Sequence, residues 1–488
     1  MAKHGSFVSH AKMETLELRT LLSSYPMSLG STGTDQATDS AVDSAGNTIC
    51  VGTFAGTVDF DPSSRVTKLT ASGIYSTFVA KYSAAGSLLW ARRLGGFTDV
   101  HDATESLWAR SAKVEIDPSG NIWVLGNFSG ARDFNPGSGV KTLTSVDDED
   151  VYLCKLTSAG NYVWAGRMGG TGGDGGWDMA VSAAGVFVTG KFQHTVDFNP
   201  GSAVFNLTSN GSSDMFVCRF TLSCGFAWAR RIGDNSPGAS RPNDQWGVGI
   251  ALDSSNNLYL AGGYQGITDF DPGAGKYTMG SIGQSENGFV MKMTSGGGFI
   301  WAKSVSTSNP TFIADLAIDT SANIYLTGGF TGKVDFDPSA TQAMLTSAGG
   351  FDIFVAKLTK SGSYVSAKRI GGSGNDLALG IAYQSGSVNL TGMFSKTVDF
   401  NPSSGVANLV SAGKADMFAC RLTSSSLTYS WAKRYGGTQD DCGWAVTPLG
   451  SSQLMILGFK SGTLDSELNV TGNSNALIDK LTQNGAQA

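Results

Sequence analysis

The chain has 488 residues, of which 65 are glycine and only 15% are charged, and its formal net charge is −6. A low charge content combined with many glycines and 41% hydrophobic residues is typical of a folded chain of strands and tight turns, and it excludes a disordered chain. The acidic balance gives no sign of a nucleic-acid binder, and no run of about 18 apolar residues predicts a transmembrane helix.

The first 24 residues are predicted to form a tail that is separate from the domain of residues 25–488. Residues 16–23 read Leu-Glu-Leu-Arg-Thr-Leu-Leu-Ser, which resembles a segment near the start of some large bacterial exported proteins. The tail lacks the apolar stretch and the Ala-x-Ala site of an ordinary signal peptide. It is therefore either related to export or a basic tail without regular structure.

The first repeated unit follows the tail and contains four short apolar runs, at about residues 36–43, 48–54, 77–83 and 87–94. Val, Ile, Phe, Tyr and Trp dominate these runs, and turn-forming residues separate them, as in the segment Asp43 to Asn47. The pattern predicts four antiparallel strands, with a longer loop at residues 55–76 between the second and third strands.

The phrase Asp-Phe-Asp/Asn-Pro marks this loop and recurs along the chain. Its first Asp is Asp59, Asp133, Asp197, Asp269, Asp335 and Asp399, and Asp465 begins a degraded seventh copy. Successive copies lie 64 to 74 residues apart. Four strands in each long repeat describe the blade of a β-propeller.

The seventh unit lacks its fourth strand at the C-terminus, and the matching strand is found at the other end of the chain. Tyr25 to Gly30 aligns with Trp90 to Gly95, the fourth strand of the first unit. Pairing of this segment with residues near Leu477 to Leu481 would close the ring and remove its open edges. The sequence therefore predicts an all-β, seven-bladed β-propeller of four-stranded antiparallel blades, closed by an N-terminal strand.

Small residues at repeated positions support this alignment. The predicted innermost strand carries alanine at one position in six units, with Glu115 in the second unit; these alanines are Ala41, Ala180, Ala251, Ala317, Ala382 and Ala445. Three of the six cysteines occupy one apolar position of the third strand, namely Cys154, Cys218 and Cys420. Because these cysteines belong to different blades, we expect free thiols rather than disulfides.

The whole repeat resembles the bacterial SBBP family of β-propeller repeats over about residues 25–485. The resemblance rests on Leu-Gly-Gly followed by Asp, Val-Asp-x-x-Gly-Asn, Asp-Phe-x-Pro and Asp-x-Phe-Val-x-Lys-Leu, although this chain inserts Asp or Asn before the proline. The resemblance implies a secreted or cell-surface location. It supplies no catalytic residues.

The Asp-Phe loops and the connections from each fourth strand to the next unit are predicted to share one face, here called the loop rim. Hard cations such as calcium prefer carboxylate oxygens, and three loops carry two aspartates each. The candidate calcium ligands are Asp59, Asp61, Asp269, Asp271, Asp335 and Asp337. The alternative, which we favour, is that each first Asp accepts backbone N–H bonds within its own turn. No other cofactor is expected.

Irregular features of the rim are the other candidates for function. They include the long connections at residues 97–107 and 234–246, the acidic run Asp147 to Asp150, and Trp108 and Trp246, which would lie either in the core or at a binding surface. The sequence contains no catalytic or phosphate-binding motif.

We therefore expect a non-enzymatic binding or structural module that holds a protein or glycan partner on the loop rim. The alternative is a carbohydrate-active hydrolase or lyase that uses rim carboxylates. A tight cluster of carboxylates with raised pKa in the central funnel would favour the enzyme. A shallow rim with exposed aromatic residues would favour binding.

Overall fold

A computed structural model describes residues 25–97, 112–234, 244–280, 286–305, 309–339, 341–464 and 470–487. Every regular element in these residues is a β-strand, as predicted. In this part of the chain no helix is long and apolar enough to cross a membrane. The predicted tail, residues 1–24, lies outside the described residues.

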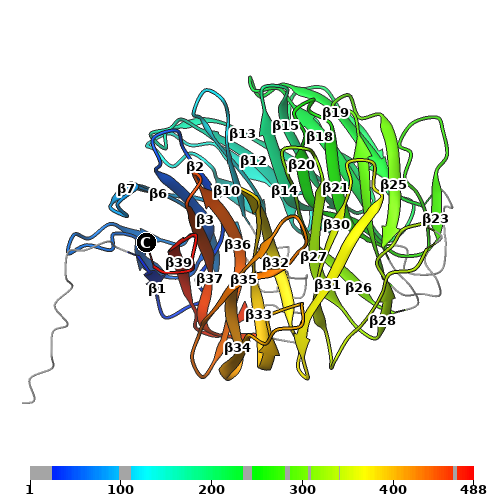
Figure 1. Ribbon diagram of the computed structural model, residues 1–488. Coiled ribbons are helices and arrows are strands. Elements are labelled where there is room, and N and C mark those ends of the chain that lie inside the picture. Colours follow the sequence, from blue (N-terminus) through cyan, green and yellow to red (C-terminus); the bar gives the residue numbers. More distant parts are fainter. Residues whose placement is uncertain are drawn as a thin grey trace, which may run out of the picture.

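The first unit is a four-stranded antiparallel sheet in the order β2-β3-β6-β7 (Figure 1). Its strands are β2 (Gln36–Val42), β3 (Thr48–Phe54), β6 (Tyr75–Tyr82) and β7 (Leu88–Phe97), close to the four predicted runs. The loop expected between the second and third strands contains a short hairpin of β4 (Thr57–Asp59) and β5 (Lys68–Thr70). Each unit is named below by its innermost strand, so this is the β2 unit.

The same four-strand order recurs along the chain, usually with the hairpin between the second and third strands. The β8 unit has β8 (Lys113–Ile116), β9 (Ile122–Phe128), β12 (Asp150–Leu156) and β13 (Tyr162–Gly170), with hairpin β10 (Ala131–Asp133) and β11 (Thr142–Thr144). The β14 unit has β14 (Gly175–Ser182), β15 (Gly185–Phe192), β18 (Asp214–Phe220) and β19 (Phe226–Ile232), with hairpin β16 (Thr195–Asp197) and β17 (Asn206–Thr208). The β20 unit has β20 (Gln245–Leu252), β21 (Leu258–Tyr264), β24 (Asn287–Met293) and β25 (Phe299–Val305), with hairpin β22 (Ile267–Asp269) and β23 (Thr278–Gly280).

The remaining units follow the same order. The β26 unit has β26 (Thr311–Ile318), β27 (Ile324–Phe330), β30 (Asp352–Leu358) and β31 (Tyr364–Gly372), with hairpin β28 (Lys333–Asp335) and β29 (Met344–Thr346). The β32 unit has β32 (Leu377–Gln384), β33 (Ser387–Asp399), β34 (Asn408–Thr423) and β35 (Tyr429–Tyr435), and its hairpin is continuous with β33 and β34. The β36 unit has β36 (Asp440–Leu449), β37 (Gln453–Leu464), β39 (Asn475–Thr482) and β1 (Met27–Gly30), with β38 (Val470–Thr471) beside β37.

The innermost strands contact one another in a closed ring, β2-β8-β14-β20-β26-β32-β36 and back to β2. The protein is therefore a β-propeller. Five blades are recognised in this arrangement, not the seven that the repeat predicts. Two units share one sheet, because β31 of the β26 unit pairs with β33 of the β32 unit. The β16–β17 hairpin of the β14 unit belongs to the sheet of the β8 unit, because β13 pairs with β16.

The N-terminal strand closes the ring as predicted. Met27 of β1 lies opposite Ile478 of β39, and Gly30 lies opposite Asn475. Beyond the strand, the backbone N–H of Asp35 donates to the carbonyl of Ser474. The C-terminus consequently lies beside β1 (Figure 1), and β1 covers the edge of β39.

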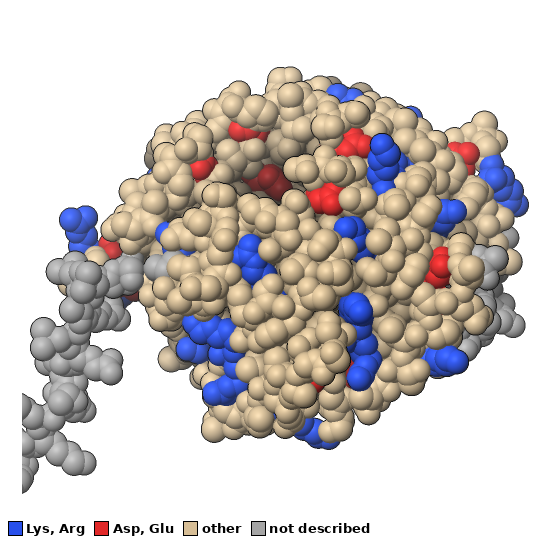
Figure 2. Space-filling view, viewed as in Figure 1, with Lys and Arg blue, Asp and Glu red and all other residues tan. Residues whose placement is uncertain are grey.

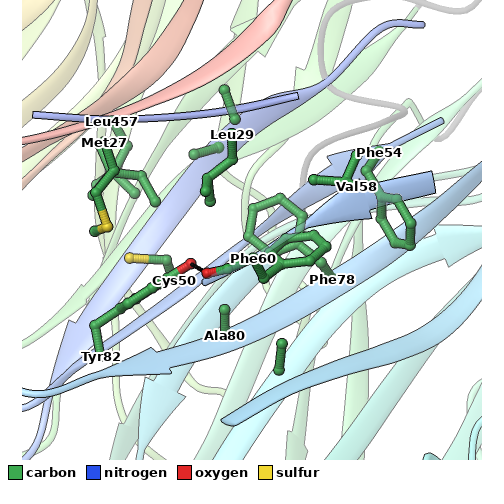
Figure 3. Close-up of a cluster of buried hydrophobic side chains, with 14 of the residues drawn as sticks. Met27, Leu29, Cys50, Phe54, Val58, Phe60, Phe78, Ala80, Tyr82 and Leu457 are labelled. Atoms are coloured by element: carbon green, nitrogen blue, oxygen red, sulfur yellow. Dashed lines mark hydrogen bonds between the residues drawn. The ribbon is translucent and has the colours of Figure 1, made fainter. Parts of the chain in front are cut away.

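The repeated phenylalanine of the Asp-Phe loop is a core residue. Phe60 lies between Phe54 and Phe78, with ring centroids 5.5 and 5.0 Å away, and the Tyr82 hydroxyl donates to its carbonyl oxygen (Figure 3). The equivalent residues Phe134, Phe198, Phe270, Phe336 and Phe400 are also buried between two aromatic rings. Each hairpin is therefore anchored by a buried ring.

The cysteine positions agree with the alignment, and one alanine position does not. Cys154, Cys218 and Cys420 are fully buried, and each lies opposite an alanine of the fourth strand. Ala445 does not share the position of Ala41: Ala445 lies opposite Leu457 as Asp39 lies opposite Val51, and Thr447 takes the position of Ala41. The alignment of this strand was wrong by two residues.

Candidate functional site

The six candidate calcium ligands lie in three separate hairpins, and their carboxylates accept backbone hydrogen bonds. Asp59 Oδ1 accepts from the N–H groups of Asp61 and Thr67 at 3.1 and 2.9 Å. Asp61 Oδ1 accepts from the N–H of Ser63. The same bonds to the first aspartate are made at Asp269 and Asp335, and the same bond to the second at Asp271 and Asp337. The described residues contain no group of three or more His, Cys, Asp or Glu that could hold a metal ion.

We predict that Asp59→Ala destabilises the protein by about 2 kcal/mol, because it leaves two backbone donors without their acceptor. Asp59→Asn keeps a hydrogen-bond acceptor at the same place and should lose much less stability. Thermal unfolding measures both variants. A calorimetric titration with millimolar calcium should show no heat, whereas calcium-dependent heat that Asp59→Asn abolishes would restore the metal interpretation.

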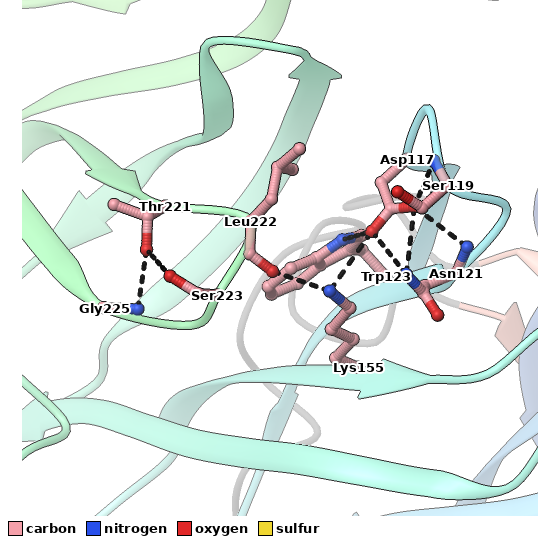
Figure 4. Close-up of polar contacts among 9 residues, drawn as sticks. All are labelled: Asp117, Ser119, Asn121, Trp123, Lys155, Thr221, Leu222, Ser223 and Gly225. Atoms are coloured by element: carbon pink, nitrogen blue, oxygen red, sulfur yellow. Dashed lines mark hydrogen bonds and ion pairs between the residues drawn. The ribbon is translucent and has the colours of Figure 1, made fainter.

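A second repeated feature lies on the opposite face, here called the turn face, where the turns between strands one and two and strands three and four are found. Asp117 accepts hydrogen bonds from the backbone of Ser119 and Asn121 in its turn, and its carboxylate pairs with Lys155 at 3.2 Å (Figure 4). The same ammonium group donates to the carbonyl of Leu222 in the next unit at 2.6 Å. This bond, from a third-strand cation to the next unit, is here called the cation latch.

The cation latch recurs at most contacts between neighbouring units. The donors and acceptors are Lys81 to Ser158, Lys155 to Leu222, Arg219 to Ser295, Lys357 to Ser424, Arg421 to Gln483, and Lys480 to Ala84. Every acceptor is the second residue of the turn between the third and fourth strands. The pair from Lys480 to Ala84 joins the last unit to the first.

A charged cluster on the innermost strands breaks the repeat. Asp39, Lys113, Asp178 and Asp315 occupy one position in four units, where the β20, β32 and β36 units have Gly249, Gly380 and Ala445. Glu115 lies two residues beyond Lys113 on β8, at the position of Ala41. We call Asp39, Lys113, Glu115, Asp178 and Asp315 the axial cluster.

Each aspartate of the axial cluster ties its unit to the next. Asp39 accepts from the backbone N–H of Val114 at 2.9 Å, Asp178 accepts from Ile250 at 2.8 Å, and Asp315 accepts from Ile381 at 3.0 Å. Lys113 Nζ lies 3.8 Å from Asp178 Oδ1. The carboxylates thus have a structural role, and Lys113 offsets part of their charge.

The electrostatics of the axial cluster are strongly coupled. Burial, with repulsion from Asp39 and Asp178, raises the pKa of Glu115 to about 8. Burial likewise raises the pKa of Asp178 to about 7 and that of Asp315 to about 6, against the opposing effect of Lys113. Burial lowers the pKa of Lys113, but the surrounding carboxylates outweigh burial and raise it. Figure 2 shows a recess in the molecular surface with acidic side chains inside it.

The sequence interpretation missed this cluster, although Glu115 stood out as an exception to the alanine position. Aligning the position two residues earlier would have displayed Asp39, Lys113, Asp178 and Asp315 in one column. That column lies on the same face as the alanine, because the two positions are two residues apart in the regular part of the strand, beyond the bulge.

The irregular rim candidates give mixed outcomes. Trp246 belongs to β20, and its ring packs over Gly263 of β21, which agrees with a packing role. In the acidic run, Asp150 is buried and pairs with Arg167 at 2.6 Å, whereas Asp147 and Asp148 are exposed. Trp108, residues 98–111 and residues 235–243 lie outside the described residues.

No family model matches the chain. It is 22% identical over 445 residues to an uncharacterised WD repeat-containing protein of Acanthamoeba polyphaga mimivirus, covering 76% of this chain and 31% of that protein. It is 24% identical over 497 residues to the regulatory protein FlaEY of Caulobacter vibrioides, covering 86% of this chain and 50% of that protein. The chain therefore spans 31% and 50% of the length of these two relatives.

Similar solved structures include the YCF48 protein of Cyanidioschyzon merolae, with 12% identity and a TM-score of 0.38, covering 93% of this chain and 98% of that chain. A microbial sialidase is similar with 9% identity and a TM-score of 0.34, covering 92% of this chain and 94% of that chain.

Proposed function

We propose that this chain is a seven-bladed propeller that serves as a non-enzymatic binding or structural module, exported or exposed on the cell surface, with a protein or glycan partner on its loop rim. The export proposal is supported by the resemblance of the repeat and of residues 16–23 to exported bacterial proteins. In this proposal the chain has two parts, the tail of residues 1–24 and the propeller of residues 25–488.

The proposed number of blades is supported by the ring of innermost strands and by the cation latch. Seven innermost strands follow one another around the ring. The third strands of six of the seven units carry a latch to the following unit, and Lys480 spans the junction between the two chain ends. A shared hydrogen bond between two units joins sheets without removing a blade.

The binding proposal is carried by one observation on the rim hairpins. Val66, Val140, Val204 and Val406 occupy the same position near the hairpin tip, and they are 66, 76, 69 and 74% exposed. A single exposed valine on a protein surface is ordinary. Each of these four hairpins buries its phenylalanine but leaves the valine at this position exposed. The rim therefore has repeated apolar side chains that are available for a partner.

The test compares the protein with the triple variant Val66→Ser, Val140→Ser and Val204→Ser, using a glycan array and capture of proteins from the surface fraction. We expect a partner that the wild type retains and the triple variant loses. The matched control is Leu89→Ser, Val163→Ser and Val365→Ser, which replaces exposed apolar residues on fourth strands. A partner that both variants lose, or that neither loses, would contradict binding at the rim.

The alternative, a carbohydrate-active hydrolase or lyase, has a different candidate site from the one the sequence suggested. The rim aspartates accept hydrogen bonds in their own turns. The axial cluster does provide carboxylates with a raised pKa, which is the property of a general acid near neutral pH. Hydrolysis of a polysaccharide that is lost in Glu115→Gln and kept in Asp148→Asn would favour the enzyme.

The axial cluster also predicts how stability depends on pH. A carboxyl with a raised pKa binds its proton more tightly in the folded state, so its stabilising effect is present below about pH 4.5 and is lost as the pH rises through about 8. Glu115→Gln should therefore gain stability relative to the wild type between about pH 5 and pH 9. The expected gain at pH 9 is about 2 kcal/mol, because each pKa unit is worth about 1.4 kcal/mol and solvent around the partly exposed Glu115 screens part of it.

Denaturant unfolding across this pH range measures the difference. Asp148→Asn, which removes an exposed carboxylate, is the control and should follow the wild type at every pH. A constant difference between Glu115→Gln and the wild type would show that the charge of Glu115 is not the cause.

A further inference from the structure

The contact between the β20 and β26 units lacks the cation latch. Its third-strand cation is Lys292, which stays within its own unit and donates to Asp253 at 3.2 Å and to the Tyr259 hydroxyl at 2.5 Å. The carbonyl that would receive the latch, that of Lys360, accepts a 3.4 Å bond from the Tyr259 hydroxyl.

A second bond found at other contacts is also missing here. The indole N–H of the fourth-strand tryptophan donates to the same turn carbonyl at three contacts, from Trp90 to Ser158, from Trp228 to Ser295 and from Trp431 to Gln483. Trp301 is the equivalent residue of the β20 unit, and its ring lies over Gly362 of the neighbouring turn. Within the described residues its indole N–H makes no such bond, although Trp301 is partly exposed.

A groove of about 980 Å³ opens on the turn face at this contact. Its walls come from the Asp253 turn and β25 of the β20 unit, from the Asp319 and Lys360 turns of the β26 unit, and from Tyr383 of the β32 unit. This volume is at the upper end of the range of small-molecule sites. The groove coincides with the contact where both inter-unit bonds are absent.

The charged side chains lining the groove balance in number, and three of the four already have hydrogen-bonding or ion-pair partners within the protein. Asp253 and Asp319 accept bonds from the asparagine that follows each of them by four residues, and Lys292 is bound to Asp253. The fourth charged residue, Lys360, is exposed at the groove margin. The lining therefore carries two positive and two negative side chains, which gives no reason to expect a strongly charged ligand.

The groups left for a ligand are apolar surface and hydroxyls. Ile300 is 42% exposed, and it lines the groove together with the partly exposed Trp301. Four serines line the same groove, Ser254, Ser255, Ser321 and Ser361. A pyranose ring has apolar C–H faces and a belt of hydroxyls, so it matches an indole beside hydroxyl donors and acceptors.

We propose that this groove binds a neutral oligosaccharide chain, with Trp301 as the apolar platform and the surrounding hydroxyls and Lys360 as hydrogen-bonding partners. This site lies on the turn face and is separate from the rim site of the proposed function. A binding module of this kind would hold a partner on one face and a polysaccharide on the other.

The test is calorimetric titration with neutral hexasaccharides of glucose, xylose and mannose, followed also by tryptophan fluorescence. We expect saturable binding of at least one hexasaccharide, weakened at least tenfold in Trp301→Ala and retained within about threefold in Trp301→Tyr. Trp228→Ala is the matched control, because it removes the equivalent tryptophan from a contact that has the cation latch. Ser255→Trp fills the groove from an exposed turn and should abolish binding even if Trp301→Ala fails to fold.

Three results would overturn the proposal: no heat with any neutral hexasaccharide, equal binding by wild type and Ser255→Trp, or binding of polygalacturonate alone. The rim variant with serine at positions 66, 140 and 204 should bind the hexasaccharide as the wild type does. A variant that no longer binds the rim partner but still binds the hexasaccharide has lost only the rim site. A variant with the opposite behaviour has lost only the groove site.

Discussion

Removal of residues 1–32 is expected to cause aggregation or to lower the melting temperature by more than 10 °C. The deletion takes away β1, which pairs with β39 and contributes the buried side chains of Met27 and Leu29 to the core of the first and last units. Loss of two buried aliphatic side chains alone costs about 4 kcal/mol or more, and the exposed edge of β39 adds a site for intermolecular pairing.

The control for this deletion begins the chain at residue 25 and so retains β1 with every contact described for it. Its melting temperature and solubility should match those of the full chain. The double variant Met27→Asp and Leu29→Asp should reproduce the larger deletion, since these two side chains face the core. A soluble protein with an unchanged melting temperature after removal of residues 1–32 would contradict closure by β1.

Replacement of one anchoring phenylalanine should also have a large effect. Phe198 is buried between Phe192 and Phe216, at centroid distances of 5.4 and 4.9 Å. Phe198→Ala is expected to lower the free energy of unfolding by about 4 kcal/mol, because it leaves a cavity and releases the β16–β17 hairpin. That hairpin pairs with Gly169 and Gly170 of β13, so the loss should also loosen the contact with the preceding unit.

Chemical denaturation measures this loss, and Phe205→Ala provides the comparison. Phe205 lies in the same hairpin but is only partly buried, and it should lose less than half as much stability. Phe198→Leu should recover most of the loss. Equal effects of the two alanine variants would show that the repeated phenylalanine is not the anchor.

The repeat was predictable because identical side chains recur at positions that the blade uses in the same way. Phe60 and its equivalents fill the same aromatic pocket, and Cys154, Cys218 and Cys420 face the same alanine. The pairing of Met27–Gly30 with a strand near the C-terminus could be predicted, because this segment aligns with the fourth strands of the other units and the last unit lacks one. Local patterns therefore predicted long-range contacts.

The axial cluster and the groove could not be predicted in the same way, because both arise where individual units depart from the repeated pattern. The environment of Lys113 is set by three carboxylates from other units, Asp39, Asp178 and Asp315, which raise its pKa. The groove lies at the contact where Lys292 turns back to its own Tyr259, whereas Lys357 in the next unit reaches across to Ser424. Sequence comparison treats Lys292 and Lys357 as the same residue. The sharing of one sheet by the β26 and β32 units likewise depends on bonds between units that the repeat does not display.

The pairing of β1 with β39 has a mechanical consequence. The two strands are antiparallel, with Met27 opposite Ile478, so the chain enters β1 and leaves β39 at the same end of the sheet. Tension applied through the residues before β1 and after β39 would load the hydrogen bonds between Met27 and Ile478 first and break the pairs one after another. A ring held together by many shared contacts would therefore open at low force, by unzipping, if it were pulled by its two ends.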